Sequence, residues 1–235
     1  MTIQVLIPLK QLTLAKQRLS PHVSAASRRR LMLCMLRRTV LAALDAAVGP
    51  VALVTSELTA SLALIPPGVE VIDDGGLAWN EGLQHALTSI QPPPTAVLYL
   101  SADLPLITSA DILKFVDSAP DPGVGVARAR DGGTNALLVR PATGIAPLFG
   151  HQPSAALHAR RAEEGGLVAR IVDINGLSLD VDTVEDLRVA RSERLHVVQP
   201  RANASRSFAE YERYTNSSRA GSRSSRRAEP SPLVT

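Results

Sequence analysis

Short apolar runs alternate with longer amphipathic stretches along the first half of the chain. Between the first two runs, residues 24–47 carry apolar side chains three and four positions apart with basic side chains opposite, which predicts a helix. Strands that alternate with helices form parallel sheets whose two faces are both covered. We therefore predict an α/β fold with a mostly parallel central sheet. Its first strands are expected at residues 3–9, 51–55, 69–73 and 96–102.

The second half of the chain carries further segments of both kinds. Residues 123–129 and 135–141 are apolar runs that flank a glycine-containing turn, which predicts a pair of strands and a mixed sheet in this half. One domain is predicted over residues 1–198. Further helices are expected at residues 80–90, 109–119, 153–165 and 183–195, and strand-like segments at 167–174 and 177–182.

The carboxyl-terminal residues 199–235 differ from the rest in composition. They are rich in Ser, Arg, Ala and Pro and poor in large apolar residues, which predicts disorder. Seven Arg and three Glu lie from residue 201 onward, so this tail accounts for the net charge of +3 and the remainder is close to neutral. A near-neutral body argues against a nucleic-acid-binding domain, although a basic tail that binds RNA or an anionic surface stays open.

The chain has one cysteine, Cys34, so it can form neither an internal disulfide nor a cysteine-rich metal site. We expect Cys34 to be a core residue of the helix at 24–47. The amino terminus enters an apolar run without a basic leader. No apolar stretch reaches the roughly 20 residues that a membrane span needs. A cytoplasmic protein with no membrane association is the expectation.

A carboxylate closes the apolar run at 96–102. Asp103 follows this buried-strand pattern directly and precedes a Leu-Pro pair. A buried, unpaired carboxylate costs on the order of several kcal/mol, so Asp103 needs either a neighbouring cationic group or a metal ion. Ligands of open α/β sheets bind beyond the carboxyl ends of the strands, and Asp103 lies at such an end.

A second pair of carboxylates stands near the end of the domain. Asp180 and Asp182 alternate with Val181, so on an extended chain both point the same way. Together with Asp103 they suit Mg²⁺, which prefers a few carboxylates and substrate phosphates. The alternative is that Asp182 or Thr183 caps the following helix, which explains one residue but not the pair.

The loop after the first strand is basic. Lys10, Lys16 and Arg18 lie within nine residues of one another, at the position where a doubly wound nucleotide enzyme holds phosphates. Three cations could neutralise a triphosphate chain, and an ordinary basic surface loop is equally compatible with the spacing.

Two later segments suit an anionic ligand. Gly133, Thr134 and Asn135 precede a strand, where backbone N–H groups and polar side chains can converge on an anion, although a plain hairpin turn has the same composition. Ser154 stands at an expected helix start, and helix N-termini bind phosphates and carboxylates. A simple Ser cap is the alternative there. His158, beside this site, is expected to pack.

A further glycine pair, Gly75 and Gly76, precedes Trp79 and Asn80 at another helix start. We expect Trp79 to pack and Asn80, beside a glycine loop, to contact a nucleotide together with the glycine pair. The sequence contains no GxxxxGK[ST] motif, so the chain is not a P-loop NTPase.

Taken together, these segments resemble one family: the guanylyltransferases that make the phosphodiester precursor of the deazaflavin coenzyme F-420. The resemblance covers about residues 3–195. It implies a single nucleotidyltransferase domain of the Rossmann-like kind found in nucleotide-diphospho-sugar transferases and in enzymes that activate the molybdenum cofactor. It also implies that GTP is joined to 2-phospholactate, phosphoenolpyruvate or 3-phosphoglycerate with release of pyrophosphate. The segments that carry it are residues 7–20, 98–108, 131–141, 149–161 and 177–187.

The resemblance assigns roles to the residues above. It implies that the three aspartates hold Mg²⁺, that the three cations of the first loop meet the GTP phosphates and assist catalysis, and that Thr134 and Ser154 with nearby amides hold the acid. Trp79 departs from the Gly-Leu-Asn-Ala pattern expected there, which leaves the base pocket undefined. The product would pass to the next enzyme of the pathway, and a homodimer stays open.

Three alternatives remain from the residues alone. Another nucleotidyltransferase would act on a sugar phosphate or molybdopterin. A glycosyltransferase would use Asp180-Val181-Asp182 as an Asp-x-Asp metal motif and release a nucleoside diphosphate. A nucleic-acid-binding protein led by its tail would lose salt-sensitive binding on truncation after residue 200.

Overall fold

A computed structural model describes residues 2–12, 15–57 and 65–197, and for 194–197 the backbone alone. The chain divides into a compact unit, Met1–Glu193, and a second unit that begins at Arg194. The predicted domain boundary at residue 198 and the predicted disordered tail at 199–235 lie outside the described residues.

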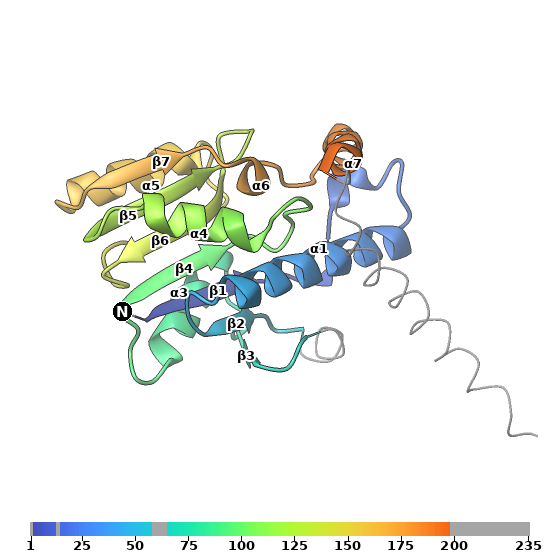
Figure 1. Cartoon of the computed structure of the whole chain (residues 1–235). Helices are drawn as coiled ribbons and strands as arrows, with labels where there is room; N and C mark the ends of the chain where they lie inside the picture. The colour runs from blue at the N-terminus through green and yellow to red at the C-terminus, as the bar shows by residue number, and fades with distance from the viewer. Residues whose placement is uncertain (1, 13–14, 58–64, 198–235) are drawn as a thin grey trace, which may run out of the picture. The chain divides into compact units, whose positions relative to one another are not determined.

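Among the described residues, one sheet of seven strands forms the centre of the first unit, in the order β3-β2-β1-β4-β6-β5-β7 (Figure 1). β6 runs antiparallel to its neighbours β4 and β5, and the other neighbouring pairs are parallel. The prediction of a mostly parallel sheet that becomes mixed in its second half is therefore confirmed. The strands are β1 (Ile3–Pro8), β2 (Val51–Val54), β3 (Val69–Ile72), β4 (Ala96–Leu100), β5 (Gly123–Arg128), β6 (Thr134–Arg140) and β7 (Ala169–Val172).

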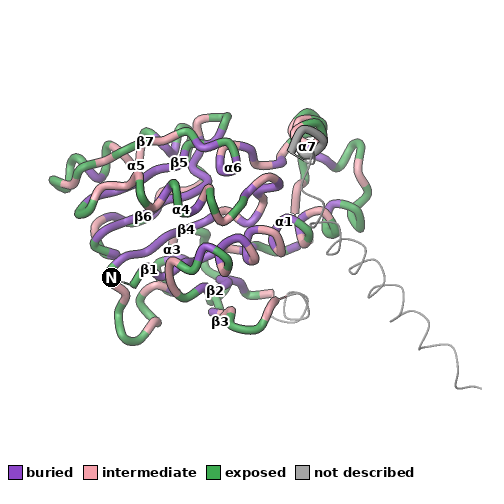
Figure 2. Tube along the Cα trace, in the orientation of Figure 1, coloured by how far each residue is buried: buried purple, intermediate pink, exposed green. Residues whose placement is uncertain are grey.

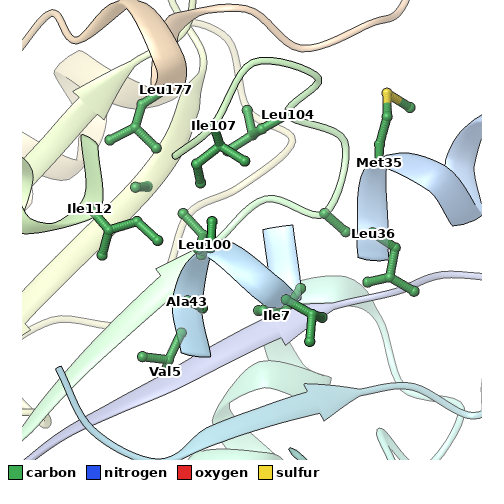
Figure 3. Close-up of a cluster of buried hydrophobic side chains, with 14 of the residues drawn as sticks. Val5, Ile7, Met35, Leu36, Ala43, Leu100, Leu104, Ile107, Ile112 and Leu177 are labelled. Atoms are coloured by element: carbon green, nitrogen blue, oxygen red, sulfur yellow. The ribbon is translucent and has the colours of Figure 1, made fainter. Parts of the chain in front are cut away.

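Helices cover both faces of this sheet. Alternate strand side chains enter two separate clusters: Val5 and Ile7 pack on the side of α1, α4 and α6, whereas Leu6 packs on the side of α3 and α5. Figure 2 shows the central strands buried along most of their length, whereas the edge strands β3 and β7 are partly exposed. Figure 3 shows Leu100 and Ile112 in the first cluster. The helices are η2 (Gln17–Leu19), α1 (Ala25–Ala46), α3 (Trp79–Ser89), α4 (Ser109–Ser118), α5 (Ser154–Glu164), α6 (Asn175–Ser178) and α7 (Val184–Val197).

Within the described part of the chain, no helix combines the length and the apolar character that crossing a bilayer requires. The longest described helix, α1, begins where the Ser24 side chain accepts a hydrogen bond from the Ser27 amide. α4 begins with a reciprocal capping box between Thr108 and Asp111. The starts of these helices are thus fixed by local side chains.

Two expectations are wrong. Residues 177–182 form no strand, since α6 spans residues 175–178 and irregular backbone follows. Buried and less buried residues of this segment alternate as in a strand, but no strand in the described part of the chain pairs with it. Cys34 is exposed, because the buried side of α1 runs through Met32, Met35 and Leu36 and position 34 lies off it.

Candidate active site

A cavity of about 720 Å³ opens at the edge of the sheet where β1, β4 and β5 end and β6 begins. Most residues singled out from the sequence line it, whereas Gly75 and Asn80 do not. The lining includes Lys10, Lys16, Arg18, Gly76, Asp103, Gly133, Thr134, Asn135, Ser154, Asp180 and Asp182.

Three carboxylates meet in this cavity. One oxygen each from Asp103, Asp180 and Asp182 lies within 4.8 Å of the others. Val181, between two of them, is fully buried, so the alternation does place both aspartates on one side. Thr183 caps α7, since its hydroxyl accepts from the Asp186 amide at 3.2 Å. The carboxylate of Asp182 is therefore not consumed by a helix cap.

The cation beside these carboxylates is Lys16. Its ammonium donates to Asp103 and, at 2.8 Å, to Asp182, and its side chain is 6% exposed. Burial lowers the pKa of Lys16, but the charges of Asp103 and Asp182 more than reverse this, and the pKa is raised. The exposed Arg18 adds a contact to Asp182 at 3.3 Å. The sequence left open whether a cationic side chain or a metal ion neutralises Asp103. In the structure the cationic side chain is that of Lys16.

Asp180 has weaker support than its two neighbours. Asn135 donates to it at 3.4 Å and, at 2.9 Å, to the Leu177 carbonyl, so this amide fixes the segment that carries Asp180. Burial, and then the charges of Asp103 and Asp182, raise the pKa of Asp180 to about 6. Three carboxylates against one buried ammonium and one exposed guanidinium leave the cluster negative. Such a set of oxygen donors fits a hard divalent cation.

The glycine turn before β6 uses its own amides. The Gly132 N–H donates to the Ala129 carbonyl at 3.0 Å, and the Gly133 N–H donates to the Asp131 carboxylate at 2.9 Å. Neither amide is thus directed at a ligand, in contrast to the expectation of converging N–H groups. The hydroxyls of Thr134 and Ser154, 3.0 Å apart, are among the polar groups that line the cavity there.

Asn80 holds the loop whose residues Phe149 and Gly150 line the cavity. Its amide accepts from the Phe149 N–H at 3.0 Å and donates to the Phe149 carbonyl at 3.1 Å. Both functional atoms of the side chain are therefore engaged with backbone. Gly75 and Gly76 adopt φ of 67° and 66°, values that favour glycine, in the turn before α3.

Trp79 does not pack as expected. It is 37% exposed and lines the cavity, and the Lys10 ammonium lies 4.8 Å from the centroid of its ring. This distance is that of a cation–π contact. Lys10, predicted from the sequence to meet phosphates, therefore rests on an aromatic face.

Sequence reasoning missed two contacts around the hydroxyl pair. His158 is fully buried, and its Nδ1 lies 3.0 Å from the Thr134 hydroxyl. Its position four residues after Ser154 on one helix was a signal that both face the same way. Gln152 donates to Asp131 at 2.9 Å, and no sequence pattern pointed to that bond.

Several solved structures share this fold. A protein of Desulfovibrio desulfuricans G20, described as a nucleotide-diphospho-sugar transferase, aligns with a TM-score of 0.61 at 20% identity over 93% of this chain and 96% of its own. A nucleotidyl transferase of Methanothermobacter thermautotrophicus aligns with a TM-score of 0.60 at 15% identity over 83% and 99%. The chain has the nucleotide-diphospho-sugar transferase-like fold.

The sequence comparisons define the family more narrowly. The family model "Guanylyl transferase CofC like" matches residues 3–193. A phosphoenolpyruvate guanylyltransferase of Roseiflexus sp. strain RS-1 is 33% identical over 188 residues, which are 80% of this chain and 84% of that one. A 2-phospho-L-lactate guanylyltransferase of M. thermautotrophicus is 34% identical over 183 residues, 77% and 81% of the two chains. The chain belongs to this family and is a nucleotidyltransferase, as its resemblance predicted.

Proposed function

We propose that this protein joins GTP to a small three-carbon phosphorylated acid and releases pyrophosphate, in the biosynthesis of coenzyme F-420. The observation that carries the proposal is one cavity lined both by the three carboxylates with Lys16 and by the Thr134–Ser154 hydroxyl pair. The relatives named above act on phosphoenolpyruvate or 2-phospho-L-lactate, which favours these two acids; 3-phosphoglycerate is the third candidate. We also propose that the reaction takes place in the cytoplasm, as expected from the sequence.

The reaction is a substitution at phosphorus. An oxygen of the acid's phosphate attacks the α-phosphorus of GTP in line, and the bond to the β-phosphate breaks as pyrophosphate leaves with the electron pair. The attacking oxygen is already anionic at neutral pH, so no general base is needed. The protein must instead align two polyanions and offset their charge.

The carboxylate cluster would hold the metal ion of this reaction. Asp103, Asp180 and Asp182 supply closely spaced oxygens with residual negative charge, which suits Mg²⁺. Bound there, Mg²⁺ would supply positive charge beside the phosphates. Lys16 keeps two of these carboxylates in place from the buried side, and Lys10 and Arg18, in the same lining, meet the triphosphate.

The test is pyrophosphate release with GTP and Mg²⁺, run in parallel with 2-phospholactate, phosphoenolpyruvate and 3-phosphoglycerate. An inorganic pyrophosphatase draws the equilibrium forward, and glucose-1-phosphate is the control substrate. We expect turnover with at least one acid and none with the sugar phosphate. Turnover with glucose-1-phosphate alone would refute the proposal and favour a sugar nucleotidyltransferase.

A matched pair of variants tests the cluster. Asp103→Asn keeps the size of the side chain and removes one metal-binding charge, so turnover should fall about a hundredfold or more. Asp117→Asn makes the same change at an exposed position of α4 outside the cavity lining and should leave turnover intact. Wild-type turnover in Asp103→Asn would remove the cluster from the mechanism.

A further inference from the structure

His158 is held on both ring nitrogens. It lies on α5, fully buried, and its Nε2 accepts a hydrogen bond from the Leu148 N–H at 2.7 Å. The Phe149 ring packs against it in an edge-to-face arrangement, with ring centroids 5.2 Å apart and planes at 63°. Nδ1 faces the Thr134 hydroxyl at 3.0 Å. The ring is therefore fixed in place and in orientation.

The contact with Leu148 determines which nitrogen carries the proton. A backbone N–H can only donate, so Nε2 must be unprotonated. Burial lowers the pKa of His158 to about 4, so the ring is neutral at physiological pH and its single proton lies on Nδ1. Nδ1–H then faces two acceptors, the Thr134 hydroxyl at 3.0 Å and the backbone carbonyl of Ser154, and Nδ1 cannot accept from Thr134.

The donated bond decides what Thr134 can offer to a ligand. Its oxygen accepts from His158, so its own proton cannot point at the ring. The Ser154 hydroxyl lies 3.0 Å away, and one of the two hydroxyls donates to the other. In either direction one proton of the pair is left over, and both residues line the cavity, so the pair presents a donor there. A donor of fixed direction suits the oxygen of an anion.

We propose that His158 is a positioning residue that holds the Thr134–Ser154 hydroxyl pair as a donor to the carboxylate or phosphate of the acid substrate. The opposite tautomer would take the proton of Thr134, so the pair would lose either its internal hydrogen bond or its donor to the anion. This inference rests on the proposed function, because it takes the acid to bind beside Thr134. If His158 only supported residues 148 and 149, the proton on Nδ1 would have no role in binding the acid.

Two isosteric variants separate orientation of Thr134 from support of the loop. An Asn amide at position 158 overlaps Nδ1 and can donate to Thr134, whereas a Gln amide overlaps Nε2 and can accept from Leu148. We expect His158→Gln and His158→Leu to raise KM for the acid about tenfold or more, the loss of about one hydrogen bond to a charged group. His158→Asn should stay within about threefold of wild type, and kcat and the KM for GTP should change little in all three.

The opposite order, with Gln active and Asn impaired, would overturn the proposal and leave His158 as a support for the loop. Equal losses in kcat and in both KM values would do the same. ¹⁵N NMR of the wild-type imidazole provides a measurement that needs no variant: a proton on Nδ1 is expected, and a proton on Nε2 contradicts the argument. If wild type turns over none of the three acids, the proposed function fails instead, while the NMR result still reports on the tautomer.

Discussion

Asp180→Asn should make the metal-free protein more stable and its catalysis worse. The pKa of Asp180 is raised from 3.8 to about 6, first by burial and then by Asp103 and Asp182. The folded state therefore holds this proton to a higher pH than the unfolded state does. This contribution to the unfolding free energy is fully present below pH 3.8 and is lost as the pH rises through 6. Above that pH, the ionised carboxyl destabilises the folded protein.

The size of the effect follows from the shift. A change from 3.8 to about 6 corresponds to about 3 kcal/mol, an upper value because solvent reaches part of the cluster. Asn has the same shape and no charge, and its carbonyl can still accept from Asn135. The variant should therefore gain up to about 3 kcal/mol over wild type at pH 7.5 in chelator and gain nothing near pH 3.8.

Urea unfolding across this pH range, with and without Mg²⁺, measures the effect. Mg²⁺ should stabilise wild type more than Asp180→Asn, because a ligand that binds only the folded state adds about 2.7 kcal/mol at a hundred times its Kd. Asp117→Asn is the control for a charge change outside the cavity. If Asp180→Asn is no more stable than wild type at pH 7.5 in chelator, Lys16 and Arg18 already neutralise the cluster and the reasoning is wrong.

Three further outcomes are expected. Lys16→Met leaves two carboxylates without their buried ammonium and should lower the unfolding free energy by about 1–3 kcal/mol at pH 7.5; an unchanged urea midpoint would contradict this. Asn80→Ala removes both bonds to Phe149, so limited proteolysis should cleave residues 149–152 faster than in wild type, and equal rates would show that the clamp is dispensable. The pKa of His158 is lowered from 6.5 to about 4. The neutral ring therefore contributes up to about 3 kcal/mol to the unfolding free energy above pH 6.5, and this contribution is lost as the pH falls through 4. His158→Asn should lose this part of the pH dependence in acid unfolding curves, and an identical slope would argue that the ring is not buried neutral.

The sequence predicted the fold because its signals are local. Strand and helix periodicity repeat within each segment, and the helix starts follow from nearby caps such as Thr108 with Asp111. The prediction failed at residues 177–182, where Leu177, Leu179 and Val181 are buried in alternation as they would be in a strand. That alternation needs only a core on one side, and whether a neighbouring strand is present depends on the rest of the chain.

The sequence predicted which types of residue make up the site, but not which of them pair with one another. Carboxylates and cations were found from their types and spacing. That Lys16 pairs with Asp103 and Asp182 depends on chain segments 87 and 166 residues away, which no local pattern encodes. The same holds for Asn80, whose amide serves a loop 69 residues further along. Pairings of this kind are set when distant segments pack, so they appear only in the folded structure.

The direction of one strand explains how both kinds of residue reach the same cavity. Asp103 follows the end of β4, at the edge where parallel strands usually present their ligands. β6 runs the opposite way, so its first residue, Thr134, and not its last, lies at that edge. The hairpin from β5 thus delivers a hydroxyl to the carboxylate cluster without another crossover helix. The reversal of one strand therefore places a donor for an anion beside residues suited to a cation, and the proposed reaction between two phosphorylated substrates requires both.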